Sequence, residues 1–179
     1  MATQNAQAHH ILIPVSQDYE DLEVWYPAMR LRGAGVRVTL ATPGGAPCTG
    51  KHGYPLKPDA ALADVTEGSL TGIMVPGGWS PDQLRRIEHL LDICRALDAR
   101  KGLVASICHG PWVLVSARIL KGRTLTCTPG IRDDVENAGG VWRDEAVVTD
   151  GNLITSRRPP DLPAFGEALV DWLHAHPRR

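Results

Sequence analysis

The sequence lacks a strong net charge, a long apolar run and any close pair of cysteines. Its 19 basic and 20 acidic residues leave a formal net charge of −1 over 179 residues. No strong electrostatic field therefore attracts nucleic acid or an anionic membrane. The apolar runs are far shorter than the roughly 20 residues that a membrane-spanning helix needs. We expect neither a nucleic-acid partner nor a membrane partner.

Targeting and metal-binding signals are missing as well. Residues 1–9 form a polar lead, which we expect to be disordered, without an apolar signal core or a basic transit pattern. The cysteines Cys48, Cys94, Cys108 and Cys127 form no CxxC pair, and the seven histidines show no HExxH or paired Cys/His spacing. We expect reduced thiols in the cytoplasm, no metal and no cofactor.

Short apolar strands and amphipathic helices alternate along the chain. Strands are predicted over residues 11–15, 36–41, 72–76, 103–107, 124–127, 146–149 and 152–155, helices over 21–32, from about 81, 88–100, 109–117, 131–138 and 161–174, and a hairpin or loop over 43–58. This alternation indicates an α/β fold with a mostly parallel sheet covered by helices on both faces. No linker or repeat divides the chain, so we expect one domain over residues 10–175 and a tail over 176–179.

The most informative stretch runs from Val104 to Trp112, where an apolar strand turns directly into a helix. The small residues Ser106 and Gly110 lie two before and two after Cys108, which is the spacing of a nucleophile elbow with sulfur in place of a hydroxyl. Unpaired amides and the dipole at a helix start lower the pKa of a thiol from about 8.5 to about 3.5–7.5. The spacing therefore predicts a reactive thiolate. The alternative is a buried core cysteine beside a surface histidine.

Polar or small residues follow three predicted strands, at the sheet edge where ligands bind in parallel sheets. The amides of Gly77 and Gly78, with that of His109, form a candidate oxyanion hole, although a glycine pair is also an ordinary strand-ending turn. Glu20 belongs to the acidic turn 18–23. It either favours the first turn of a helix or reaches the sulfur as a protonated hydrogen-bond donor. The spacing does not choose between these two interpretations.

Two other motifs fail on their chemistry. The segment 45–52 nearly matches a phosphate-binding loop, but His52 replaces the magnesium-binding hydroxyl and Pro47 removes a loop amide. A class I amidotransferase needs a distant His-x-Glu pair, and neither His174 nor His176 has a glutamate two residues on. The sequence therefore favours neither nucleotide binding nor amide transfer.

Several segments together resemble one family, the ThiJ/PfpI family in the superfamily of DJ-1. The resemblance covers about residues 10–175 and is carried by segments 19–23 (YEDLE), 50–54 (GKHGY), 75–78 (VPGG), 107–111 (ICHGP), 129–134 (PGIRDD) and 150–157 (DGNLITSR). Within this family the sequence most resembles the PfpI branch, whose members are described as intracellular cysteine peptidases, glyoxalases and deglycases.

The resemblance implies a flavodoxin-like three-layer sandwich that assembles as a homodimer, sometimes further into a hexamer. It places Cys108 on the family nucleophile, His109 on its general base and Glu20 on its protonated carboxyl partner. Gly78 and the His109 amide fall on the oxyanion donors. Asp82 matches an acidic residue that orients the histidine from an adjacent subunit, where the archaeal form carries a glutamate.

Our leading hypothesis for the function is cofactor-free sulfur chemistry on a small carbonyl compound. Cys108 would attack methylglyoxal, or its adduct on a protein amine, and His109 would move protons on the way to lactate. An intracellular cysteine peptidase is the second hypothesis. The third is a non-enzymatic oxidation sensor or chaperone, in which Cys94 or Cys127 would resolve an oxidised Cys108.

Overall fold

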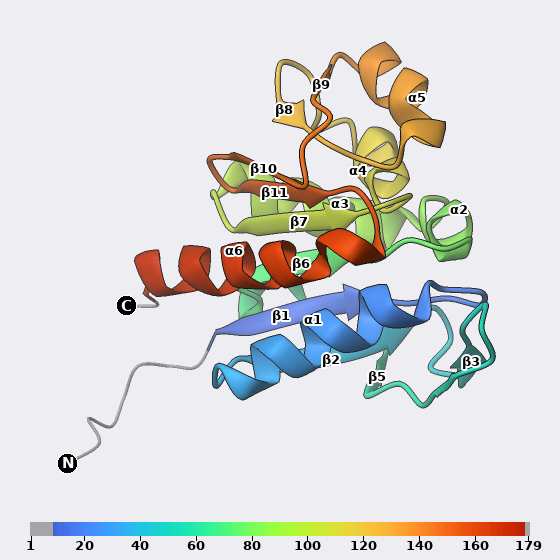
Figure 1. Cartoon of the computed structure of the whole chain (residues 1–179). Coiled ribbons are helices and arrows are strands. Elements are labelled where there is room, and N and C mark those ends of the chain that lie inside the picture. Colours follow the sequence, from blue (N-terminus) through green and yellow to red (C-terminus); the bar gives the residue numbers. More distant parts are fainter. Residues whose placement is uncertain (1–8, 178–179) are drawn as a thin grey trace.

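The computed structural model describes residues 9–177 and contains a seven-stranded sheet (Figure 1). The strands of this sheet are β1 (His10–Pro14), β2 (Arg37–Thr42), β5 (Ala60–Ala61), β6 (Gly72–Val75), β7 (Leu103–Ile107), β10 (Val147–Asp150) and β11 (Leu153–Ser156). They lie in the order β10-β11-β7-β6-β1-β2-β5, and every neighbouring pair is parallel except β10 and β11. The central order β2-β1-β6-β7-β11 is that of a flavodoxin-like sheet, as predicted.

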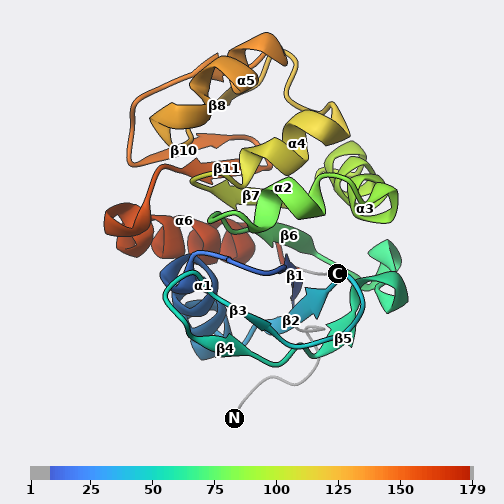
Figure 2. The ribbon, with the colours of Figure 1, turned by 90° about the vertical axis from the view of Figure 1, so that its right-hand side faces the viewer.

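Helices cover both faces of the sheet (Figure 2). They are α1 (Asp21–Gly33), α2 (Ser80–Leu84), α3 (Glu88–Ala99), α4 (Pro111–Ala117), α5 (Arg132–Asn137) and α6 (Leu162–Ala175). Along β1, Ile11 and Ile13 pack in the core that contains α1 and α6, whereas Leu12 packs in the core that contains α3 and α4. This alternation, required by a pleated strand buried on both sides, confirms the three-layer prediction.

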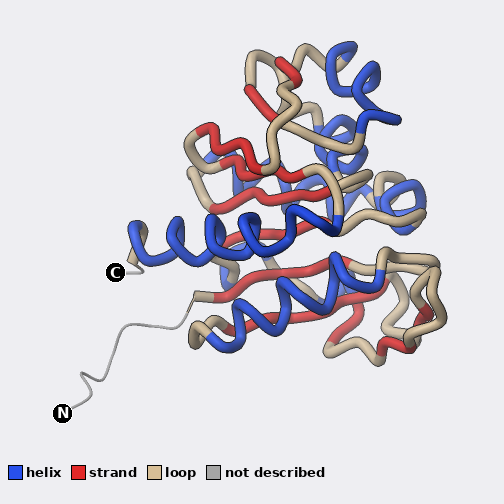
Figure 3. Tube along the Cα trace, viewed as in Figure 1, coloured by secondary structure: helices blue, strands red, loops and turns tan. Residues whose placement is uncertain are grey.

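Two small sheets lie outside the main sheet (Figure 3). β3 (Cys48–Thr49) pairs antiparallel with β4 (Pro55–Leu56), so the predicted hairpin over 43–58 is present. β8 (Thr124–Leu125) lies in the strand predicted over 124–127 and pairs in parallel with β9 (Val141–Trp142). β9 was not predicted, because two residues carry no periodicity. Short 3-10 helices cover Leu62–Asp64, Glu67–Ser69, Pro129–Ile131 and Pro159–Asp161.

The predicted ends of the domain lie close to the ends of the described chain. Apart from His9, the lead 1–9 falls outside the described residues, and so do positions 178 and 179 of the predicted tail. The regular elements run from β1 to α6, which ends at Ala175. Among residues 9–177, no helix combines the length and the apolar character that crossing a bilayer requires.

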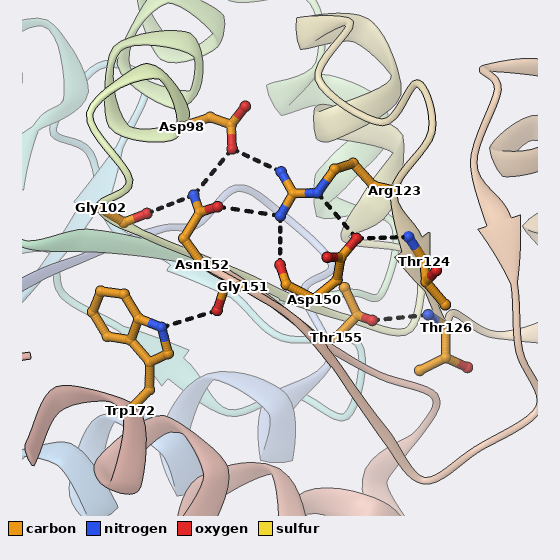
Figure 4. Close-up of polar contacts among 10 residues, drawn as sticks. All are labelled: Asp98, Gly102, Arg123, Thr124, Thr126, Asp150, Gly151, Asn152, Thr155 and Trp172. Carbon is orange, nitrogen blue, oxygen red and sulfur yellow. Dashed lines mark hydrogen bonds and ion pairs between the residues drawn. The ribbon is translucent and has the colours of Figure 1, made fainter. Parts of the chain in front are cut away.

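An arginine ties the segment that carries α5, β8 and β9 to the start of the sheet strands (Figure 4). The guanidinium of Arg123 forms ion pairs with Asp98 at 3.0 Å and Asp150 at 3.2 Å. It also donates to the Asp150 carbonyl at 2.6 Å and to the Asn152 side chain at 3.2 Å. Asn152 donates in turn to Asp98 at 3.0 Å. Because Arg123 and Asp98 are largely buried, each needs its partner to offset its lost hydration.

We predict that Arg123→Met lowers the free energy of unfolding by roughly 2–4 kcal/mol, because it leaves buried acceptors and a carboxylate without their donor. Urea denaturation measures the change. Arg32→Met is the matched control, since the Arg32–Asp59 ion pair is solvent-exposed and its loss costs no more than about 1 kcal/mol. Equal losses in the two variants would contradict the assigned role.

Candidate active site

Cys108 lies in a tight turn after β7, with a φ of +60°. A non-glycine residue in this region costs about 1–3 kcal/mol unless its surroundings hold it there. The Cys108 N–H donates to the Ser156 carbonyl at 3.1 Å, and the Cys108 carbonyl accepts from the Thr128 N–H at 3.1 Å. A Cβ atom on Gly110 would lie 2.3 Å from the Val75 carbonyl oxygen. The elbow therefore requires a glycine at this position.

The environment of the sulfur differs from the expected helix start. The predicted helix over 109–117 begins at Pro111, whose ring nitrogen carries no N–H. Burial raises the pKa of the Cys108 thiol, and the charge of Glu23 raises it further, whereas the N–H groups of His109 and Gly78 lower it. The expected pKa of about 3.5–7.5 is therefore wrong.

The carboxyl group beside the sulfur belongs to Glu23, in the first turn of α1. Its side chain is completely buried, and Oε2 accepts the Gly77 N–H at 2.8 Å. Burial raises the pKa of Glu23 to about 8, so this carboxyl keeps its proton at neutral pH. Within residues 9–177 no donor reaches Oε1 in hydrogen-bond geometry, and the carboxyl interacts with the Cys108 side chain. If Oε1 carries the carboxyl proton, Oε1 becomes a hydrogen-bond donor and needs no N–H or O–H group from another residue.

The prediction that Glu20 is the carboxyl partner of the sulfur is corrected by this arrangement. Glu20 forms an ion pair with Lys51, and its Oε1 lies 3.7 Å from Nε2 of His52. The contact with Glu20 raises the pKa of Lys51. Glu20 precedes α1 whereas Glu23 lies within it, so the two carboxyls of one acidic turn face different neighbours. Glu20 anchors the β3–β4 loop and Glu23 contacts the nucleophile.

Glu20, Asp21 and His52 also bring potential metal-ligand atoms within 4.8 Å of one another. The search for paired His/Cys spacing missed this group because two of its members are carboxylates from another segment. Both carboxylates already have partners. Glu20 pairs with Lys51, and Asp21 accepts the N–H groups of His52 at 3.0 Å and Tyr54 at 3.1 Å. These contacts account for the cluster as a tie between α1 and the loop.

His109 lies against the nucleophile, with Nδ1 3.2 Å from Sγ of Cys108. The left-handed turn brings together two adjacent side chains that a regular helix or strand would separate. Burial lowers the pKa of His109, and the positive charge of Lys51 lowers it further. The ring is therefore neutral at neutral pH and can accept a proton from the thiol.

The two glycines after β6 have different tasks. The Gly78 N–H lies toward the sulfur of Cys108 and favours its anionic form. Gly78 has a φ of +73°, and a Cβ atom there would lie 2.4 Å from the Glu20 nitrogen. The Gly77 N–H instead donates to Glu23. The prediction that Gly77 is an oxyanion donor is therefore wrong. The amides of Gly78 and His109 remain as the candidate donors.

Asp82 lies in α2, apart from this group. Within one chain its partner is Arg86, with Oδ2 2.5 Å from Nη2. The ring of His109 lies instead beside the rings of Trp79 and Trp112, with centroids 5.7 Å and 5.1 Å away. That Asp82 orients the histidine of a second copy stays a prediction. The sequence patterns did not identify either tryptophan, although Trp112 ends the stretch 104–112 and Trp79 directly follows Gly78.

Comparisons with known proteins show which family and which solved structures the chain is similar to. The model of the DJ-1/PfpI family matches residues 9–172. The chain is 41% identical over 163 residues to the deglycase PfpI of Pyrococcus furiosus, covering 91% of this chain and 98% of that one. It is 37% identical over 164 residues to a Bacillus subtilis protein provisionally named a cysteine protease, covering 91% and 97%. Drosophila melanogaster DJ-1beta superposes with a TM-score of 0.88 at 29% identity, covering 93% and 91%.

We predict that Glu23→Gln lowers the apparent pKa of the Cys108 thiol, because it removes the carboxylate charge that forms above about pH 8 and disfavours the thiolate. The rate of iodoacetamide alkylation at Cys108, followed by mass spectrometry as a function of pH, gives this value. Glu20→Gln is the matched control and should shift it less. A thiol pKa that stays unchanged or rises in Glu23→Gln would sink the assignment.

Proposed function

Because this chain belongs to the DJ-1/PfpI family, we propose that it is a cofactor-independent cysteine hydrolase that acts on reactive carbonyls. Its substrates are methylglyoxal and the adducts that methylglyoxal forms on protein amines, and its product is lactate. The observation that carries the proposal is the 3.2 Å approach of His109 Nδ1 to Cys108 Sγ. The deglycase names of the archaeal relatives support the same chemistry.

The reaction begins with activation of the thiol by the neutral histidine. His109 takes the proton from Cys108, and the sulfur attacks the aldehyde carbon. A carbon–sulfur bond forms, the π electrons of the carbonyl move to its oxygen, and that oxygen takes the proton back from His109. The N–H groups of Gly78 and His109 stabilise the negative charge before this protonation. With an amine adduct, the sulfur displaces the amine, which leaves with its electron pair and a proton.

The resulting hemithioacetal rearranges without an external oxidant. His109 removes the proton from the carbon bound to sulfur and returns a proton to the neighbouring carbon. The first carbon is thereby oxidised to a thioester and the second is reduced to an alcohol. Water then attacks the thioester, and Cys108 leaves as the thiolate and regains its proton. The sum is methylglyoxal plus water giving lactate.

A protonated Glu23 favours the charged states of this cycle. While Cys108 is anionic, the carboxyl proton on Glu23 can be donated to the sulfur, because the pKa of Glu23 is raised to about 8. An ionised Glu23 would instead repel the thiolate. The buried carboxyl therefore lets a thiol of raised pKa become a nucleophile only transiently, when His109 holds its proton.

A peptidase is the second candidate, favoured by the provisional protease name of the Bacillus subtilis relative. The same sulfur and histidine can attack a peptide carbonyl. Cys108 is only part-exposed, however, and its sulfur lies against Glu23 of the acidic turn and the Gly78 N–H, which favours small substrates. We further propose that Asp82 from a second copy orients His109, in a homodimer or hexamer.

The redox-sensor alternative receives less support from the thiols. A sensor cysteine needs thiolate character and exposure, whereas burial raises the pKa of Cys108. The two candidate resolving thiols, Cys94 and Cys127, are both buried. Burial raises the pKa of each to about 12.

Turnover of methylglyoxal tests the proposed function. We expect the purified protein to form lactate and Cys108→Ser to lose this activity at least ~1,000-fold, because a hydroxyl at this site lacks a base strong enough to ionise it. His109→Gln should lose about 100- to 10,000-fold. Cys48→Ser is the matched control and should retain full activity, since Cys48 lies in β3. Casein cleavage without any lactate would favour the peptidase, and lactate formation by Cys108→Ser would overturn the proposal.

A further inference from the structure

Trp79 is an exposed tryptophan that is separated from the nucleophile by the ring of His109. Its side chain follows Gly78 at the end of β6 and is 60% exposed. Its ring centroid lies 5.7 Å from that of His109, whose Nδ1 contacts the sulfur. Leaving so large an apolar surface in water is unfavourable. A group that covers this ring during the reaction would also lie within reach of Cys108.

The main chain holds Trp79 between two acidic residues. Its N–H donates to the Asp18 carbonyl at 2.9 Å, and its carbonyl accepts from the Asp82 N–H at 3.1 Å. Asp82 pairs with Arg86, whereas Asp18 has no ion pair among the described residues. The backbone of Trp79 is therefore fixed on both sides. Asp18 contributes a negative charge to this region that no described ion pair offsets, which favours a positively charged ligand over a negative one.

The neighbouring tryptophan shows what such a ring accepts. The guanidinium of Arg85 lies over the ring of Trp112, 5.5 Å from the centroid. Trp112 is the other aromatic neighbour of His109, with ring centroids 5.1 Å apart. Indole is the aromatic side chain that attracts a cation most strongly. Within residues 9–177 no arginine or lysine occupies the ring of Trp79 in this way. Within a single chain its exposed face is open to a cation from outside the chain.

We infer that Trp79 is a specificity-determining residue that binds the guanidinium group of an arginine side chain carrying the carbonyl adduct. This inference rests on the proposed function. The flat cation stacks on the indole while the adduct carbon, at the end of the same side chain, lies at the sulfur. Free methylglyoxal has no such group and makes no use of this contact. The site therefore distinguishes an arginine adduct from the free dicarbonyl by the ring of Trp79.

The first test compares substrates across variants. We expect Trp79→Leu to lower the ratio of kcat/KM for the methylglyoxal adduct of Nα-acetylarginine amide to kcat/KM for free methylglyoxal by about tenfold. Trp79→Phe should restore most of the ratio. Met29→Ala, at another exposed apolar side chain, should leave it unchanged. An equal fall for both substrates, or a change in the molecular mass of the assembled protein in Trp79→Leu, would overturn the inference.

The second test needs no turnover, so it separates failure of this inference from failure of the proposed function. Nα-acetylarginine amide is titrated into the Cys108→Ser protein, and the indole N–H signal of Trp79 is identified in NMR spectra by its loss in Trp79→Phe. We expect this signal to shift with the arginine compound and much less with its neutral isostere, Nα-acetylcitrulline amide. Equal shifts with both compounds, or no shift with either, would overturn the inference even if lactate forms.

Discussion

The burial of one carboxyl group, that of Glu23, is the constraint on which this active site depends. A charged carboxylate in this position would lose its hydration, and the single N–H of Gly77 repays only part of that loss. The group therefore keeps a proton to about pH 8. The neighbouring thiol is subject to the same penalty. The Glu23 carboxyl and the Cys108 thiol are buried side by side, so they do not both ionise. This sets the order of proton transfers at the site.

The fold creates this buried site by bringing the ends of three strands, β1, β6 and β7, to one edge of the sheet. The segment after β1 leads into the first turn of α1, which carries Glu23. The turn after β6 carries Gly77 and Gly78, and the turn after β7 carries Cys108. An isolated bridge between Tyr19 and Gly78 joins the first two turns. Main-chain hydrogen bonds hold each turn, and the Glu23 side chain adds a bond to the Gly77 N–H. The sulfur, its base and its two amide donors therefore stay in place before any substrate binds.

Much of this arrangement could be predicted from local spacing. The alternation of strands and helices specified a parallel sheet, and Ser106 and Gly110 around Cys108 specified the elbow. The choice between Glu20 and Glu23 was beyond local spacing, because both carboxyls lie in one acidic turn and are buried, and only the position of α1 against the sheet decides which of them faces the sulfur. The same holds for Gly77 and Gly78, since an amide's partner is set by an element far away in the chain. The raised pKa of the thiol also follows from burial, which no short motif records.

The proton on Glu23 can be observed directly. In protein labelled with carbon-13 at the glutamate carboxyl groups, the signal of Glu23 is identified by its absence from the Glu23→Gln spectrum. The account predicts that this signal titrates near pH 8, far above the ordinary value of 4.5. Titration near the ordinary value would mean that Glu23 is ionised beside the sulfur at neutral pH, and the account of how the thiol is activated would be wrong.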